Sequence, residues 1–146
     1  MRELTSTPKG YETDSDKVCA PEHTVDRARA AFGRFGAGIL AETRRIDTGR
    51  LGIPVYLSLC GPTARQIMPT RKQMGKGASP AQAQASALME LAERFSFFSF
   101  WNTPENFRSM TWSEAQAAWP GEVMPIAEMT KSVADALSPT DAAAVL

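Results

Sequence analysis

The sequence predicts an α+β fold in which helices pack on a mostly antiparallel sheet, and three observations support this prediction. Apolar residues recur at helical spacing after Pro21 and again after Ser79. Between these two segments, residues 39–46 and 53–60 have the pattern of short strands joined by turn residues. The 146 residues also suffice for one domain with a buried core, because folding at this length buries about 68–70% of the unfolded surface.

The N-terminal end differs in composition from the rest of the chain. Residues 1–16 are polar and show no sustained hydrophobic period, which is typical of a flexible segment. We expect residues 17–146 to form the folded part, beginning with a helix after Pro21. Its apolar stripe, which ends at Gly33 and Gly36, consists of Val25, Ala28, Phe32 and Phe35.

An antiparallel pair of strands is expected next. Residues 39–46 can be extended, and residues 47–50 supply a turn. Ile53, Val55, Leu57 and Leu59 then alternate with Pro54, Tyr56, Ser58 and Cys60, which predicts one buried face. Pro54 lacks a backbone donor and therefore fits the start or the edge of its strand. A turn at 61–63 leads to a third strand, expected at 66–70.

The strongest local signal is a helix start at Ser79. Ser79, Pro80 and Gln82 occupy the N-cap, first helical and N3 positions of a capping box. The core-facing stripe of this helix is expected to consist of Leu88, Leu91, Phe95 and Phe98. The opposite side is expected to carry Gln82, Ser86, Glu90 and Glu93.

The chain after Trp101 carries weaker signals. Thr111 and Glu114 form a second capping box, which should start a short helix through Trp119, and residues 126–137 are weakly helical. An aromatic cluster precedes this region and would indicate a protein interaction surface if it is exposed: Phe97, Phe98, Phe100 and Trp101.

Composition excludes several classes of protein. Sixteen basic and sixteen acidic residues leave no formal net charge, so nothing global attracts the chain to nucleic acid or to a membrane. No apolar run is long enough to span a bilayer and the N-terminus has no apolar signal core, so we expect a cytoplasmic protein. Cys19, Cys60 and the single histidine, His23, form no zinc, disulfide or triad pattern, and no catalytic nucleophile is predicted.

Two glutamates are the best candidates for a metal site. Glu90 and Glu93 lie three residues apart on one helix face, with Ser86 one turn earlier and Arg94 four residues after Glu90. Magnesium is typically held by one or two carboxylates together with substrate phosphates. The spacing fits such a site, and it equally fits a solvated helix face with an ordinary glutamate–arginine pair.

Three further residues suit a phosphate. Lys76 lies between two glycines, although the segment is not a P-loop and an exposed lysine in a turn is the alternative. Lys17 precedes the first helix and Thr24 lies in or near its first turn, where free backbone donors and the helix dipole favour an anion.

Read together, these segments resemble the first signature of the YcaO family. Gly75-Lys76-Gly77 matches its Gly-Lys-Gly turn, and residues 86–94 match its S-A-L-x-E-x-x-E-R helix. Lys17 and Thr24 keep the spacing of the family's N-terminal lysine and hydroxyl residue, and residues 52–56 resemble its strand before the signature. The resemblance covers residues 17–101, so residues 17–146 would be the N-terminal part of a YcaO domain.

The resemblance implies an ATP site in which helix glutamates hold Mg2+. Glu90 and Glu93 would be the magnesium ligands, with Ser86 and Arg94 as neighbours. Lys17, Thr24 and Lys76 would contact the nucleotide. The implied activity is phosphorylation of a backbone amide oxygen after a nucleophile has added to the amide. Its products are azolines or thioamides in peptide modification (RiPP biosynthesis), and a further implied role is accessory factor in ribosomal-protein methylthiolation.

The resemblance also implies partners and a limit. The partners are a peptide or protein substrate, a TfuA-like or leader-peptide-binding protein, and a second copy in a homodimer. A second signature of glutamine, glutamates and arginine is not found after Trp101. We therefore expect an incomplete YcaO-type domain, with part of the site and little turnover alone. The alternative is a non-catalytic protein-interaction module or an inactive fragment.

Overall fold

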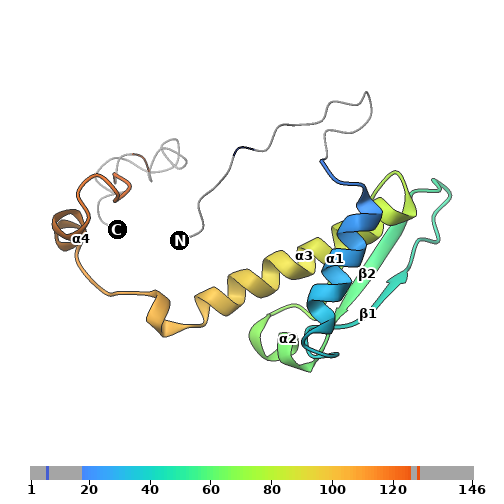
Figure 1. The fold of residues 1–146 in the computed structure, drawn as a ribbon, viewed down its shortest axis with the longest axis horizontal. Coiled ribbons are helices and arrows are strands. Elements are labelled where there is room, and N and C mark those ends of the chain that lie inside the picture. Colours follow the sequence, from blue (N-terminus) through green and yellow to red (C-terminus); the bar gives the residue numbers. More distant parts are fainter. Residues whose placement is uncertain (1–5, 7–17, 126–127, 129–146) are drawn as a thin grey trace. The chain divides into compact units, whose positions relative to one another are not determined.

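The computed structural model describes residues 6, 18–125 and 128, and the chain divides into two compact units, residues 1–106 and 107–146. The first unit is the α+β fold that the sequence predicts (Figure 1). Its sheet, within the described residues, contains strands β1 (Leu40–Arg45), β2 (Val55–Cys60) and β3 (Lys72–Lys76) in the order β1-β2-β3. Both pairs are antiparallel.

Helix α1 (Pro21–Gly33) confirms the predicted first helix. Its apolar stripe buries Val25, Ala28 and Phe32. Phe35 was wrongly placed in that stripe, because the helix has ended by then and the side chain is 65% exposed. The chain turns at Gly36, whose φ of 58° lies in the left-handed region that glycine adopts readily.

The β1–β2 pair confirms the predicted hairpin, and Asp47 closes the connection between its strands. Arg45 donates from Nε and Nη2 to the two carboxylate oxygens of Asp47, at 2.6 and 2.9 Å. The Val55 backbone N–H also donates to Asp47 Oδ1, at 3.1 Å. Strand β2 begins at Val55, so Pro54 lies just before it and Ile53 is an exposed loop residue.

The third strand was predicted in the wrong place. Residues 66–70 include the end of helix α2 (Pro62–Ile67), and β3 follows at Lys72–Lys76. Gly61 is the N-cap of α2 and Pro62 its first residue, an arrangement that favours a helix start over the predicted turn. Met68 adopts an extended conformation and ends the helix.

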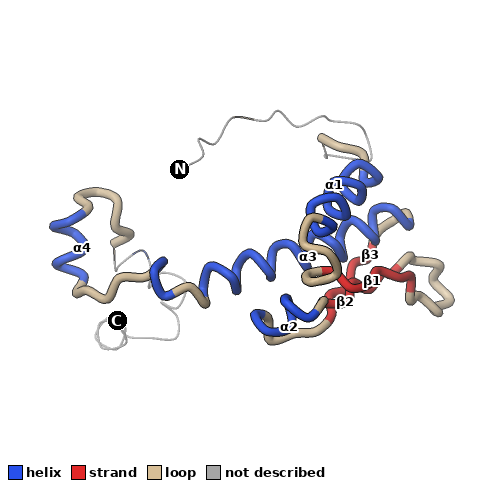
Figure 2. The backbone as a smooth tube through the Cα atoms, turned by 60° about the horizontal axis from the view of Figure 1, so that its bottom comes forward, coloured by secondary structure: helices blue, strands red, loops and turns tan. Residues whose placement is uncertain are grey.

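Helix α3 (Pro80–Trp101) starts as predicted at Ser79, whose Oγ accepts a hydrogen bond from the Gln82 N–H at 3.2 Å. The second half of the capping box is shifted by one residue, because Gln82 Oε1 accepts from the Ala78 N–H at 2.9 Å. Helices α1 and α3 lie on the same side of the sheet (Figure 2).

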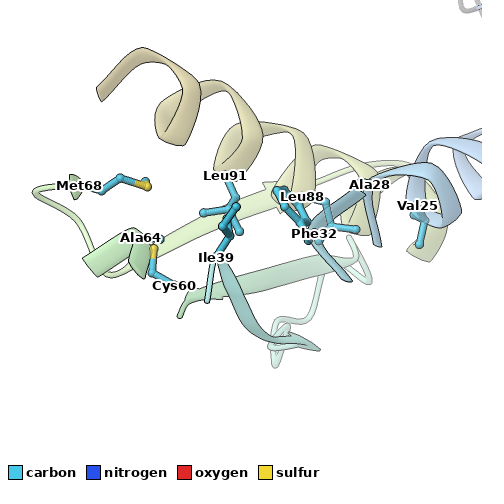
Figure 3. Packing of buried hydrophobic residues seen from close by; sticks show 9 residues of the cluster. All are labelled: Val25, Ala28, Phe32, Ile39, Cys60, Ala64, Met68, Leu88 and Leu91. Atoms are coloured by element: carbon cyan, nitrogen blue, oxygen red, sulfur yellow. The ribbon is translucent and has the colours of Figure 1, made fainter. Parts of the chain in front are cut away.

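The core of the first unit lies where α1 and α3 meet the sheet (Figure 3). Leu88 and Leu91 of the predicted α3 stripe are fully buried there, and Phe95 and Phe98 pack against the cluster. Its members are Val25, Ala28, Phe32, Ile39, Cys60, Ala64, Met68, Leu88 and Leu91.

The sheet face against α3 carries small and polar residues of β2 rather than its aliphatic ones. Ser58 and Cys60 are fully buried, and Gln73 of β3, opposite Ser58, is 2% exposed. Leu57, one residue away, lies on the other face together with Met74. Small side chains on the strand let the helix approach the sheet closely.

The second unit contains helix α4 (Trp112–Ala118), preceded in the first unit by a 3-10 turn, η1 (Pro104–Asn106). The predicted capping box is present in full: Glu114 N–H donates to Thr111 Oγ1 at 3.3 Å, and the Thr111 N–H donates to Glu114 Oε2 at 2.7 Å. The helix expected at 126–137 falls almost entirely outside the described residues. Among the described helices, none combines the length and apolar character that crossing a membrane requires.

Candidate functional site

A cavity of about 680 Å³ lies where the first turn of α1, the end of β3 and one face of α3 come together. Its volume is within the range of about 300–1,000 Å³ that is usual for small-molecule sites. Its lining residues are Cys19, Pro21, Thr24, Lys76, Gly77, Gln82, Ala85, Ser86, Met89, Glu90, Glu93 and Arg94.

The structure brings together every predicted site residue that it describes. Thr24 comes from α1, Lys76 from β3, and the other four from α3: Ser86, Glu90, Glu93 and Arg94. Lys17 lies outside the described residues. Residues distant in sequence therefore line one cavity, which their spacing along a single helix would not by itself predict.

One continuous face of α3 forms the long wall of the cavity. It runs from Gln82 to Arg94, a rise of about 18 Å along the helix axis. The opposite face buries Leu88 and Leu91 in the core. Because core packing fixes the rotation of α3, both glutamates are directed away from the hydrophobic stripe and line the cavity.

The two cavity glutamates differ in their surroundings. Glu90 Oε1 accepts a hydrogen bond from Arg94 Nε at 2.9 Å, an ion pair with side chains 34% and 44% exposed. Glu93 makes no ion pair within the part of the chain that the structure describes. The wall thus offers one carboxylate held in place by an arginine and one that is available to a cation.

The first turn of α1 contributes anion-binding character to the opposite side of the cavity. No side chain caps this helix, whose N-cap is Ala20, and Pro21 occupies its first position. The Thr24 N–H donates to Ala20 O at 3.4 Å, while the donors before it receive no side-chain cap. Uncapped N–H groups and the helix dipole favour a negative group there.

The glycines around Lys76 are explained by packing. A Cβ at Gly75 would lie 2.1 Å from the Ala87 backbone N, and one at Gly77 would lie 2.5 Å from Gln82 Cβ. Only glycine therefore allows β3 to pass this close to the start of α3. The interpretation of this segment as a turn was wrong, because Gly75 and Lys76 are the last residues of β3.

Sequence reasoning missed the apolar part of the cavity. Pro21, Ala85 and Met89 line it but were given no role. Ala85 and Met89 precede Ser86 and Glu90 by one residue each, four positions apart on the same side of α3. This four-residue spacing could have indicated that the two apolar side chains lie beside the predicted site residues.

The cavity combines oxygen ligands that suit a hard divalent cation with a lysine and a helix N-terminus that suit an anion. A comparison with protein-family models matches residues 74–144 to the YcaO family, described as YcaO cyclodehydratase, ATP- and Mg2+-binding. Residues 74–144 therefore match part of a YcaO domain, which confirms the resemblance seen in the sequence.

The matched range and the observed resemblance overlap only partly. The match begins at Met74, directly before the Gly-Lys-Gly segment, and contains Ser86, Glu90, Glu93 and Arg94. It continues beyond Trp101, where the resemblance had ended, and it does not include Thr24. A search of curated proteins and a search of solved structures each found no match.

Proposed function

We propose that this chain contributes to ATP- and Mg2+-dependent activation of peptide backbone amides. The observation that carries the proposal is the placement of Glu90 and Glu93 in the same cavity as Thr24 and Lys76. The match of residues 74–144 to a family described as binding ATP and Mg2+ supports the same nucleotide and metal.

The residues present fit a magnesium ion. Two carboxylates on one helix face agree with a cation held by one or two carboxylates and completed by phosphate oxygens and water. A bound magnesium ion would supply charge stabilisation at phosphoryl oxygens. Arg94 restrains Glu90, and Glu93 is the carboxylate with greater freedom to adjust.

The other cavity residues would bind and orient the nucleotide. The first turn of α1, with Thr24, would donate hydrogen bonds to phosphate, and Lys76 would add a positive charge. Pro21, Ala85 and Met89 would cover the less polar part of the nucleotide and exclude water from it. Lys17 stays a predicted contact.

The proposed reaction requires no nucleophile from the enzyme. A cysteine, serine or threonine side chain of the substrate, or an external sulfur species, adds to the amide carbon. The former carbonyl oxygen then takes the γ-phosphoryl group from ATP and ADP leaves. Loss of phosphate, with release of a proton, gives an azoline or a thioamide. The role as accessory factor in ribosomal-protein methylthiolation is proposed on family resemblance alone.

A second candidate function is that of a protein-interaction module, and the end of α3 favours it. Phe97 and Trp101 stack at 5.9 Å between ring centroids and are 54% and 59% exposed. Phe98, by contrast, packs against the core. Exposed aromatic surface of this kind is typical of interfaces.

Calorimetric titration of Mg2+ and ATP into the full chain tests the proposal. We expect the Glu90→Gln/Glu93→Gln variant to bind at least about tenfold more weakly, because metal affinity depends strongly on the ligand set. The control is Glu105→Gln/Glu122→Gln, which makes the same charge change at exposed positions outside the cavity. Equal affinity in the two variants would remove the metal role and leave the interaction module.

A further inference from the structure

Strand β3 forms one edge of the sheet, and the end of that edge lies in the cavity wall. The Cys60 N–H donates to Arg71 O at 3.0 Å, and the Gly77 N–H donates to Pro54 O at 3.4 Å. Hydrogen-bonding direction alternates along an antiparallel strand, so Gln73 and Gly75 also face β2. The other residues of β3 direct their backbone N–H and C=O groups outward in the plane of the sheet, away from β2. These residues are Lys72, Met74 and Lys76.

The two edges of the sheet differ in how open they are to another strand. On β1, the register shifts between Leu40 and Glu42, a bulge that disfavours further pairing. Strand β3 pairs with β2 in unbroken register from Lys72 to Lys76 and contains no proline. Among the described residues, no strand covers its outer side.

The side chains along this edge define the chemistry of a partner strand. Gly75 faces α3, so Lys72 and Met74 lie on the opposite face of the sheet, and Lys76 ends the strand where it borders the cavity. Both lysines are exposed, and neither forms an ion pair within the described part of the chain. An incoming strand would meet a positive charge, an apolar side chain and a second positive charge at alternate positions.

We propose that the free edge of β3 binds an extended acidic peptide as a fourth strand and directs it toward the cavity at Lys76 and Gly77. The peptide would be the substrate whose backbone amide is activated, so this inference rests on the proposed function. A second copy of the chain fits less well: antiparallel self-pairing centred on Met74 sets Lys72 against Lys76, and like charges directly opposite destabilise a pair.

Amide NMR titrations of the full chain test this edge without nucleotide. The probes are two synthetic peptides, Ac-TETVTET-NH2 and Ac-TKTVTKT-NH2, added to millimolar concentration. We expect the acidic peptide to shift the Met74 and Lys76 amide signals and to bind about three- to tenfold more tightly than the basic one. Lys72→Glu, which lies outside the cavity, should abolish that preference, because the edge then carries one charge of each sign.

A backbone variant and its control separate strand addition from simple charge attraction. Met74→Pro removes an outward N–H without removing a donor to β2, and should abolish peptide binding. Met74→Ala keeps the N–H and should retain binding. Absence of shifts at Met74 and Lys76, or unchanged peptide preference in Lys72→Glu, overturns the proposal even if Met74→Pro fails to fold. If the Met74 and Lys76 amide signals shift with protein concentration in the absence of peptide, the edge of β3 pairs with a second copy of the chain, and the peptide proposal is overturned.

Titrating ATP with Mg2+ into the same samples distinguishes the two proposals. Shifts at Glu93 and Thr24 with ATP, together with no peptide effect at β3, would reject the peptide edge and keep the nucleotide site. Peptide binding at β3 without any ATP effect would reject the proposed function, and with it the role of that peptide as a substrate for amide activation.

Discussion

Asp47 controls the connection between β1 and β2 through three hydrogen bonds. The two bonds from Arg45 and the bond from the Val55 N–H all stabilise its charged form. They lower the pKa of Asp47 to about 2, with the Arg45 hydrogen bond as the largest cause.

This shift predicts how stability depends on pH. In the unfolded chain the carboxyl has a pKa of about 3.9, so its contribution to folding is fully present above about pH 4. That contribution is lost as the pH falls through about 2, the folded value. Between pH 4 and 2 the urea midpoint of Asp47→Asn should therefore decrease less than that of the native chain. Parallel curves for the two proteins would contradict the prediction.

Strand β3 and helix α3 depend on the glycines that separate them. At Gly75, an added Cβ would approach two backbone atoms, Ala87 N at 2.1 Å and Ala83 O at 2.3 Å, and neither can move without shifting the helix. The close contact between β3 and α3 therefore requires glycine at position 75.

Replacing Gly75 by alanine should lower the free energy of unfolding by at least about 1–3 kcal/mol, because overpacking forces the backbone to shift. Gly49→Ala is the matched control, since nothing lies within 4 Å of a Cβ at that position. We expect the control to change stability by less than about 0.5 kcal/mol. Denaturant unfolding of both variants gives the comparison, and equal losses would show that the strand–helix contact is looser than described.

The N-cap of helix α3 allows a second test at the level of secondary-structure elements. Ser79→Ala removes the oxygen that caps the Gln82 N–H and should cost about 1 kcal/mol. Ser113→Ala replaces an exposed serine within α4 and serves as the control for loss of a hydroxyl. Thermal unfolding followed by circular dichroism measures both, and a harmless Ser79→Ala would mean that packing alone fixes where α3 begins.

At the scale of the whole molecule, the division into two units predicts separate responses to mutation. Thr111→Ala breaks the capping box of α4 in the second unit. Hydrogen exchange should show faster exchange in residues 112–118 and unchanged protection at Leu88 and Leu91 in the first unit. Reduced protection at these two leucines would show that the units unfold together.

Local patterns predicted most elements of the first unit, and long-range packing decided the rest. Capping at Ser79 and the α3 stripe are encoded within a few residues, so α3 was found from sequence. Apolar Ile67 and Met68 gave a strand pattern at 66–70, but the helix start at Pro62 prevailed. Periodicity also could not indicate that the face of β2 with Ser58 and Cys60 would meet α3.

Residue spacing predicted the parts of the candidate site, whereas only the family resemblance predicted that they form one site. Glu90 and Glu93 were expected on one helix face from their spacing, and in the structure both line one cavity. Their meeting with Thr24 depends on how α1 packs against α3, a contact between distant parts of the chain that spacing does not encode. The roles of these residues as ligands stay predictions.

The two cysteines occupy opposite environments, and this gives the protein a natural labelling position. Cys19 is exposed and lines the cavity, whereas Cys60 is fully buried and burial raises the pKa of its thiol. A maleimide dye at neutral pH should therefore attach to Cys19 alone, because the reactive thiolate of Cys60 is both scarce and shielded. Its emission would report directly on whatever enters the space beside it, without any engineered change to the chain.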